Sequence, residues 1–331
     1  MEESLVHTTK ATAFAPATIA NVAVGFDILG FPVEGVGDTV SVERLDPSPG
    51  EPPRVLIESI DGCAAGCVGL PLDAGSNTAG IALLRLLRDE ALSWGFRLRI
   101  RKGIPLSSGM GGSAASSVAA LVAANALLPR PLPPERLLAY ALLGEELASG
   151  SAHGDNAAPC IYGGLTLLRS VDPVELVRVP LPAGLAVALA HPHMELDTRT
   201  SRAALPSELP LKDYVAQSAN LASFIASCYT ADLDLMGRCL SDVLVEPRRA
   251  KLIPAFGTVK RAALKAGALG CSISGSGPSL FALCRSLEDA RRAGAAMAAA
   301  WEAAGIELDL WASIVATKGA RLVPEGLEAG L

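Results

Sequence analysis

The feature that most constrains how this chain folds is a Gly/Ser-rich stretch between a strand pattern and an Ala-rich helix pattern. The stretch is Pro105-Leu-Ser-Ser-Gly-Met-Gly-Gly-Ser-Ala-Ala-Ser-Ser. Alternating apolar residues predict a strand over 96–100, and a helix is predicted over 113–128, where Pro129 ends it. The glycines at 109, 111 and 112 allow a tight turn in which backbone N–H groups approach a ligand closely.

This loop predicts an anion-binding site at the start of the helix. The first-turn amides of a helix have no carbonyl partner within it, and the positive end of the helix dipole lies there, so phosphate is favoured. A plain flexible turn is the alternative interpretation. Two common nucleotide-loop patterns are absent, because no Lys follows Gly112 and Ala114 occupies the place of the third Gly in G-x-G-x-x-G.

A second helix pattern, from Pro133-Pro134 to about Ala148, carries a carboxylate on its apolar side. At 3.6 residues per turn, Glu145 falls inside an apolar stripe made of Leu137, Leu138, Ala141, Leu142 and Ala148. Burying an unpaired charge costs several kcal/mol, so we expect a cation beside it, and a phosphate site would supply Mg²⁺. If the helix is shorter or rotated, Glu145 is solvated instead.

The remaining patterns mix helices and strands without regular alternation. Helices are predicted over 77–92, 212–228, 233–244, 252–266 and 287–304, and strands over 38–45, 56–60, 164–168, 185–190, 280–284 and 307–315. A polar loop is predicted over 149–159. This order predicts an α+β fold of two layered domains, residues 1–170 and 171–331.

Composition excludes several classes of partner. The 331-residue chain is half hydrophobic, has a net charge of −6, and contains no run of Lys and Arg. We therefore expect a small-molecule substrate and neither a nucleic-acid nor a membrane partner. No apolar run reaches the roughly 20 residues of a membrane span, and the N-terminus lacks signal-peptide features, so cytoplasm is expected. The seven cysteines, with only Cys63 and Cys67 close together, predict reduced thiols and no zinc site.

Three further features are ambiguous when taken singly. His153 lies in a small polar segment, where a histidine is usually exposed. The segment 272–279, Ser-Ile-Ser-Gly-Ser-Gly-Pro-Ser, forms either a second anion-binding nest or a turn. Two arginine pairs, Arg199 with Arg202 and Arg248 with Arg249, could bind a carboxylate bidentately or remain solvated.

Taken together and in this order, these segments resemble the GHMP kinase family of galactokinases, mevalonate kinases, phosphomevalonate kinases and homoserine kinases. The resemblance covers nearly the whole chain through three motifs, at 15–30, 105–117 and 274–278. Within that family the chain is most similar to the homoserine kinases. Four segments carry this similarity: the first motif (15–30), His153-Gly-Asp-Asn-Ala-Ala-Pro, Ser201-Arg202 and Glu246-Pro-Arg-Arg. Gly112 and Ala23-Val24 differ from the common family pattern.

The resemblance implies a two-domain fold, with an N-terminal domain like the second domain of ribosomal protein S5 and a ferredoxin-like C-terminal domain. It implies an ATP-dependent kinase that phosphorylates the L-homoserine hydroxyl to O-phospho-L-homoserine in threonine biosynthesis. It further implies Mg²⁺, a homodimer, and a cytoplasmic location, or the plastid stroma for a processed plant form. Rival interpretations are another GHMP kinase, acting on mevalonate or a sugar, and a non-catalytic paralogue that binds ATP or an amino acid.

The resemblance also implies individual roles. Ser113 and Glu145 match the Mg²⁺ ligands. Residues implied to bind the nucleotide are Asn77, Lys102, Pro105, Ser107, Ser108, Gly109, Met110, Gly111, Gly112, Ser113, Ala114 and Ala115. Residues implied to bind homoserine are Asn21, Asp27, His153, Arg202, Arg249, Ser274 and Gly275. In this assignment Asp27 pairs with the ammonium and an arginine clamps the carboxylate. No base is required, so Asn156 and Arg202 are the expected catalytic residues, which orient and stabilise.

Overall fold

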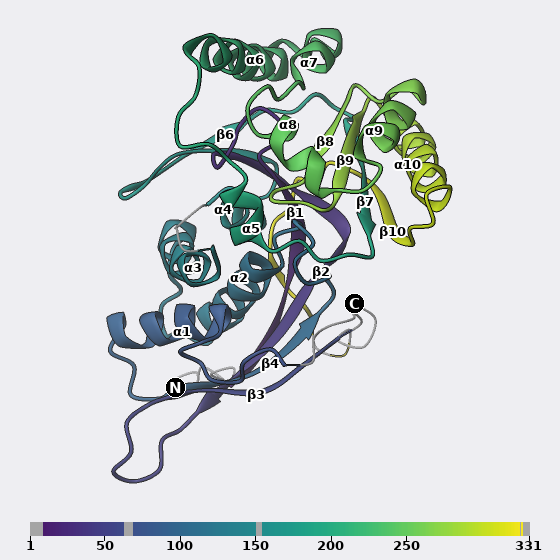
Figure 1. Cartoon of the computed structure of the whole chain (residues 1–331). Helices are drawn as coiled ribbons and strands as arrows, with labels where there is room; N and C mark the ends of the chain where they lie inside the picture. The colour runs from purple at the N-terminus through teal and green to yellow at the C-terminus, as the bar shows by residue number, and fades with distance from the viewer. Residues whose placement is uncertain (1–8, 63–68, 150–153, 325, 327–331) are drawn as a thin grey trace.

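The chain folds around two β-sheets, each with helices packed against it (Figure 1). The computed structural model describes residues 9–62, 69–149, 154–324 and 326. A large apolar core lies around the first sheet, and a smaller core lies between the second sheet and its helices. The mixture of helices and sheets confirms the predicted α+β class.

The larger sheet has seven strands. Its main order is β11 (Arg321–Leu322), β1 (Lys10–Ala20), β2 (Leu29–Leu45), β4 (Gly95–Lys102) and β3 (Val55–Gly62), while β5 (Leu165–Val171) pairs with β2 and β6 (Val174–Val179). Among the strands of this sheet that the structure describes, β3 and β4 alone pair in parallel. The register of β1 against β2 shifts between Pro16 and Thr18, where a residue without a backbone N–H is tolerated.

Four helices accompany this sheet: α1 (Thr78–Asp89), α2 (Gly112–Asn125), α3 (Pro134–Ser149) and α4 (Ala157–Tyr162). Helix α2 contacts both β1 and β2 and is also packed by α1 and α3. Its small Ala and Ser side chains permit this close approach, and nearly all of them are buried. The start of α2, where the Gly/Ser-rich loop ends, is therefore fixed by packing on several sides.

The smaller sheet has the order β10 (Leu308–Ile314), β7 (Ala186–Pro192), β9 (Leu280–Cys284) and β8 (Gly270–Ile273), all antiparallel. Helices α9 (Phe256–Lys265) and α10 (Leu287–Glu302) pack together beside it (Figure 1). Their core includes Trp301, which is fully buried. Along the chain this part consists of a strand, helices, two strands, a helix and a strand, and with the spatial order β10-β7-β9-β8 these elements form the expected ferredoxin-like arrangement.

The connection between β7 and β8 is long and helical. It contains α5 (Thr198–Ala203), α6 (Leu211–Thr230), α7 (Leu233–Cys239), α8 (Glu246–Arg249) and a 3₁₀ turn, η1 (Ala250–Leu252), before α9. Helices α5 and α8 carry Arg202 and Arg249, while α6 and α7 lie at the outer end of the molecule (Figure 1). No helix in the described part of the chain is long and apolar enough to cross a membrane.

Several predicted boundaries were wrong. Helix α7 ends at Cys239 rather than 244, because the Asp242 carboxylate accepts hydrogen bonds from the amides of Leu244, Val245 and Glu246 and so starts α8. The helix predicted over 252–266 begins only after Pro254. The predicted polar loop 149–159 includes the start of α4.

Strands β1, β6 and β11 were not predicted from the sequence. Strand β1 is buried on both faces, so its residues show no polar period. The β5–β6 hairpin spans the predicted domain boundary at 170/171, and β11 returns from the end of the chain to the first sheet. The division into 1–170 and 171–331 stays a prediction.

Candidate functional site

A cavity of about 370 Å³ is lined by residues from both halves of the chain. Its walls come from the turn after β1, the segment before α1, the end of β4, the Gly/Ser-rich loop, α3, α5, α8 and the turn after β8. Predicted residues that line it are Asn21, Asp27, Asn77, Lys102, Pro105, Ser107, Ser108, Gly109, Gly111, Gly112, Ser113, Glu145, Asn156, Arg202, Arg249 and Gly275. The fold therefore gathers most of the predicted site into one place.

The loop 105–111, here called the phosphate loop, has a backbone that favours glycine. Gly109 and Gly111 have φ angles of 74° and 71°, and Gly111 precedes α2 without a side-chain cap. A Cβ atom on Gly111 would lie 2.2 Å from Thr18 Oγ1. The first-turn amides of α2 consequently face the cavity end of the helix without competition from a capping side chain.

Both halves of the molecule hold this loop. From the larger sheet, Thr18 N donates to Met110 O at 3.0 Å. From the turn between β8 and β9 of the smaller sheet, Ser274 Oγ donates to Gly109 O at 2.8 Å and Ser279 Oγ donates to Ser108 O at 2.6 Å. Hydrogen bonds from both halves of the chain thus hold the loop in its conformation.

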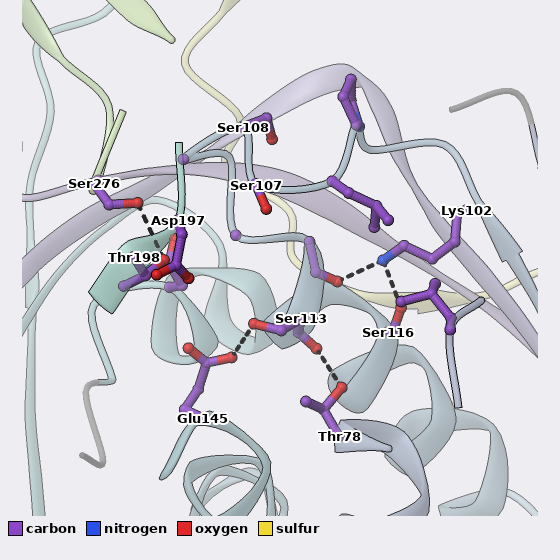
Figure 2. A pocket seen from close by; sticks show the side chains of 18 of the residues that line it. Thr78, Lys102, Ser107, Ser108, Ser113, Ser116, Glu145, Asp197, Thr198 and Ser276 are labelled. Atoms are coloured by element: carbon purple, nitrogen blue, oxygen red, sulfur yellow. Dashed lines mark hydrogen bonds between the residues drawn. The ribbon is translucent and has the colours of Figure 1, made fainter. Parts of the chain in front are cut away.

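Glu145 lies on α3 opposite the first turn of α2 (Figure 2). Ser113 Oγ donates to its Oε1 at 2.7 Å. The side chain is buried, as predicted, and this burial raises its pKa to about 7, although the Ser113 hydrogen bond and the Lys102 charge oppose the shift. A hydroxyl and a carboxylate are hard oxygen ligands, so the pair suits Mg²⁺.

A second part of the cavity lining, here called the arginine end, contains Asp27, Arg202 and Arg249. Arg202 pairs with Asp27 through Nη2–Oδ1 at 2.8 Å and Nη1–Oδ2 at 3.1 Å. Both guanidinium groups lie 5.3 Å from the ring centre of Phe26. Burial and then the Arg202 charge lower the pKa of Arg249 to about 10. Two cations converge here, so the arginine end favours an anion.

Three asparagines at the cavity are held by backbone or hydroxyl groups. Asn21 donates to Gly275 O at 2.8 Å and so bridges the two halves. Asn156 Oδ1 accepts from Thr18 Oγ1 at 2.7 Å. Asn77 caps α1 by accepting from Ala79 N at 3.0 Å. Each amide orientation is therefore fixed by the fold.

Some predicted residues do not reach the cavity. The side chains of Met110, Ala114 and Ala115 are fully buried in the core beneath the loop, so only their backbone can serve a ligand. Ser274 is fully buried too, and it acts on the loop through Gly109 rather than on the cavity. His153, Cys63 and Cys67 lie outside the described residues.

Several polar residues that line the cavity were not predicted as site residues, among them Asp155, Asp197, Thr198 and Ser276. Thr198 Oγ1 and Ser276 Oγ are 3.3 Å apart, and Asp197 caps α5 (Figure 2). Burial, followed by the charges of Asp27 and Glu145, raises the pKa of Asp155 to about 8. The N-capping pattern Asp197-Thr-Arg-Thr could have revealed α5. Nothing local distinguishes Asp155 from an exposed acid.

The described residues hold no group of three or more His, Cys, Asp or Glu placed to bind a metal. A Mg²⁺ site here would need ligands beyond Ser113 and Glu145. Phosphate oxygens and water commonly complete the Mg²⁺ shell in kinases. The structure is therefore compatible with a metal that arrives with a nucleotide.

Comparisons with known proteins cover most of the chain and point to one family. Models of the GHMP kinases N terminal domain and the GHMP kinases C terminal domain match residues 77–164 and 224–303. The chain is 52% identical to homoserine kinase of Xylella fastidiosa (strain 9a5c) over 314 residues, 95% of this chain and 94% of that protein.

Solved structures agree. A crystal structure of homoserine kinase from Cytophaga hutchinsonii is 44% identical, with a TM-score of 0.91 over 98% of this chain and 99% of that one. Mevalonate kinase of L. major, at 15% identity, shares the fold alone, with a TM-score of 0.68 over 94% of this chain and 98% of that one. The chain therefore belongs to the GHMP kinase family.

Proposed function

We propose that this chain is an ATP-dependent kinase that transfers the γ-phosphoryl group to the side-chain hydroxyl of L-homoserine. The products are O-phospho-L-homoserine and ADP, which assigns the enzyme to threonine biosynthesis. One observation carries the proposal: a single cavity joins a Gly-rich helix N-terminus to an aspartate and two arginines. The high identity to proteins named homoserine kinase supports the same substrate.

At one end, the phosphate loop and the start of α2 would receive the phosphates of ATP. The backbone forms a tight turn, with Gly109 and Gly111 at positive φ, and a loop held in one conformation loses less entropy when a nucleotide binds. The segment around Asn77, which includes Leu70 and Pro71, supplies apolar and amide groups beside this end. These would contact the remainder of the nucleotide.

At the arginine end, the charges complement an amino acid. A zwitterion can exchange partners with the Asp27–Arg202 pair: its ammonium takes the Asp27 carboxylate, and its carboxylate takes the guanidinium groups of Arg202 and Arg249. Arg202 Nε is buried and has no hydrogen-bond partner among the described residues. An incoming carboxylate would accept a hydrogen bond from Arg202 Nε, and its negative charge would reduce the repulsion between Arg202 and Arg249.

The other interpretations fit these charges less well. Mevalonate has a carboxylate but no ammonium, and galactose has neither. Binding mevalonate would leave Asp27 with a displaced arginine and no replacement cation. A non-catalytic paralogue would have no use for a buried acid beside the loop, and Glu145 is such an acid.

Ser113 and Glu145 would hold Mg²⁺. When bound, the metal supplies positive charge to the β- and γ-phosphates. The raised pKa of Glu145 fits a carboxylate whose counter-cation binds together with the substrate.

In the reaction, a bond forms between the homoserine hydroxyl oxygen and the γ-phosphorus. The bond from that phosphorus to the bridging oxygen of ADP breaks, and the hydroxyl proton is released to water. Because the transition state of phosphoryl transfer is loose, positioning and charge neutralisation supply most of the rate. Asn156, fixed by Thr18, would orient the hydroxyl, and Arg202 would stabilise the charge that develops.

A coupled assay of ADP release tests the proposal with homoserine, mevalonate and galactose as alternative acceptors. We expect turnover with homoserine that exceeds the others by at least about a hundredfold, since an unpaired buried charge costs several kcal/mol. Comparable turnover with mevalonate, or none with any acceptor, would reject it. A homodimer and a cytoplasmic location stay predictions, which light scattering and cell fractionation would test.

A further inference from the structure

A buried ion pair beside the phosphate loop includes Asp38, an acid that was not predicted as a site residue. Asp38 on β2 is fully buried and pairs with Lys102, the last residue of β4. The register of these antiparallel strands places Thr39 opposite Arg101, so Asp38 and Lys102 occupy the next facing positions. The pairing is therefore imposed by the sheet.

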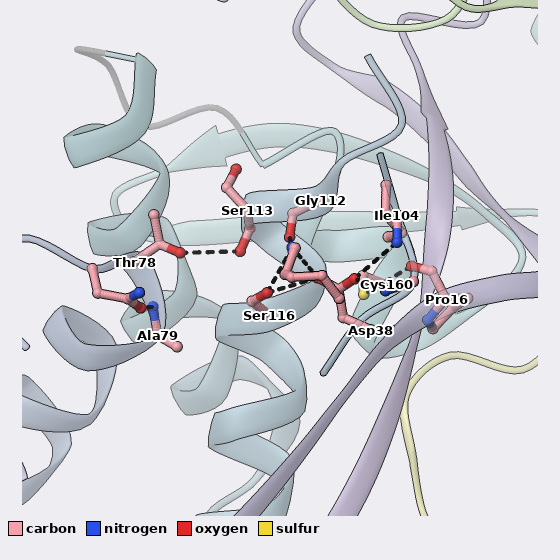
Figure 3. A network of polar contacts seen from close by, with 12 residues as sticks. Pro16, Asp38, Thr78, Ala79, Ile104, Gly112, Ser113, Ser116 and Cys160 are labelled. Atoms are coloured by element: carbon pink, nitrogen blue, oxygen red, sulfur yellow. Dashed lines mark hydrogen bonds and ion pairs between the residues drawn. The ribbon is translucent and has the colours of Figure 1, made fainter. Parts of the chain in front are cut away.

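Asp38 is connected to the residues that lead into the loop. Its Oδ1 accepts from the backbone amides of Gly103 at 3.0 Å and Ile104 at 3.1 Å, and Ile104 immediately precedes the loop (Figure 3). Its Oδ2 accepts from Lys102 Nζ and from Ser116 Oγ, the latter at 2.6 Å. One carboxylate thus joins the entry of the loop to the second turn of α2.

Lys102 connects the same carboxylate to the exit of the loop. Its ammonium group donates to Gly112 O at 2.8 Å, to Ser116 Oγ at 2.8 Å and to Asp38. An ammonium group has three N–H donors, and these three acceptors match that number. Ser116 accepts from Lys102 and donates to Asp38, so the donors and acceptors of the network are consistent.

We propose that Asp38, acting through Lys102 and Ser116, is a positioning residue that sets the phosphate loop for nucleotide binding. The network fixes the residues just before the loop and just after it, and so fixes the distance that the loop must span. Lys102 then serves the nucleotide through Gly112 and α2 rather than by direct contact with a phosphate. This inference rests on the proposed function, because it assigns the loop to ATP.

Removing two charges from water costs free energy that offsets much of the attraction between Asp38 and Lys102, so the pair adds little to the stability of the fold. A buried pair contributes little net free energy compared with apolar residues of the same volume. A fully hydrogen-bonded network, however, holds its members in one geometry, and loops held in this way bind ligands with a smaller loss of entropy. A positioning role therefore explains the network better than a purely stabilising one.

The test measures ADP affinity by calorimetry, without homoserine, for the wild type and Asp38→Asn. We expect ADP to bind at least tenfold more weakly to the variant, with the homoserine KM changed less than twofold in the kinase assay. Val40→Ala is the matched control, because Val40 is also fully buried, two residues along the same strand. It should lower the melting temperature and leave ADP affinity unchanged.

A second pair of variants separates the two roles of Lys102. If Lys102 acts through the network, Lys102→Met and Asp38→Asn/Lys102→Met should weaken ADP binding to the same extent. If Lys102 contacts a phosphate directly, Lys102→Met should weaken ADP binding far more than Asp38→Asn, which would overturn the proposal. Ser116→Ala removes two links without a buried charge, so it should fold even where Asp38→Asn does not, with ADP binding about threefold weaker.

The outcomes are distinct. A wild-type protein that binds no ADP would overturn the proposed function together with this inference. Unchanged ADP affinity in Asp38→Asn, or in Ser116→Ala where Asp38→Asn does not fold, would overturn the positioning role alone. The positioning role would also be overturned if Val40→Ala weakened ADP binding as much as Asp38→Asn, because general destabilisation of the fold would then explain the loss of affinity.

Discussion

The two ends of the cavity are held in different ways. At the phosphate loop, buried side chains bind the backbone: Asp38 accepts from two amides, and Ser274 and Ser279 each donate to a carbonyl. At the arginine end, Arg202 and Asp27 bind each other and are partly exposed, at 33% and 23% of their side chains. Arg249 at the same end is buried and donates to the carbonyls of Ser201 and Gly275.

This difference matches what each end would bind. A phosphate chain presents similar oxygens in every nucleotide, so a rigid backbone cradle suits it. An amino acid brings both a positive and a negative group, so an ion pair whose partners can be exchanged suits it better. If the contrast is correct, changes in the phosphate loop should alter nucleotide binding, and changes at the arginine end should alter homoserine binding.

Glu145→Gln should lower kcat by about a thousandfold while the protein still folds. The change keeps the shape of the side chain and its contact with Ser113, but it removes the negative charge proposed to hold the metal. Steady-state kinetics at saturating substrates, with circular dichroism as the check on folding, measure this effect. A kcat near that of the wild type at millimolar Mg²⁺ would show that the acid has no role in catalysis.

Gly111→Val should weaken ADP binding by about a hundredfold or more. The new Cβ would meet Thr18 Oγ1 at 2.2 Å and Asn156 Oδ1 at 2.6 Å, and the positive φ angle strains any β-branched residue. Gly35→Val is the matched control, since Gly35 also has a positive φ but has no heavy atom within 4 Å of the added Cβ. Equal ADP affinity in Gly111→Val and the wild type would mean that the loop is only a turn.

Arg202→Lys and Arg249→Lys should each weaken homoserine binding by about 1.5–3 kcal/mol, the usual contribution of a hydrogen bond to a charged group. Lysine keeps the charge but loses the planar two-pronged geometry. ATP affinity should barely change, and Arg248→Lys, beside the site, should alter neither. If ATP affinity falls instead of homoserine affinity, the arginines belong to the phosphate end and the contrast between the two ends is lost.

Asp155 lies near the charges of both ends, and its titration should be visible in the stability of the free protein. Its pKa is raised from 3.8 to about 8, so the folded state holds a proton that the unfolded state releases. Stability should therefore fall as the pH rises from about 4 to about 8. Asp155→Asn mimics the protonated form and should stabilise the protein by about 1–2 kcal/mol at pH 8 and hardly at all at pH 4.

Thermal unfolding of metal-free protein across this pH range measures the effect of Asp155. A variant that shifts the melting temperature equally at pH 4 and pH 8 would show that Asp155 titrates normally. In that case the cavity is better solvated than its depth indicates, and the arginine end would be even more open relative to the phosphate loop.

Local patterns in the sequence predicted most of the longer helices and several strands, and they indicated one buried acid and one glycine-rich turn. The period of the helix from 134 placed Glu145 on a buried face, and the glycines of the phosphate loop indicated the turn before α2. Both depend on residues within a few positions of each other, where spacing alone determines geometry. The family motifs then located Asp27, Arg202 and Arg249, although each of these residues alone was ambiguous.

The tertiary structure alone decided which charges meet. Asp38 reaches Lys102 across 64 residues of sequence, and Asp27 meets Arg202 across 175. The first contact depends on the register of β2 against β4, and the second on how the helical connection after β7 returns to the turn after β1. Neither the β2–β4 register nor the position of the connection after β7 can be recognised from a local pattern in the sequence, because both are fixed by packing between elements that are distant along the chain.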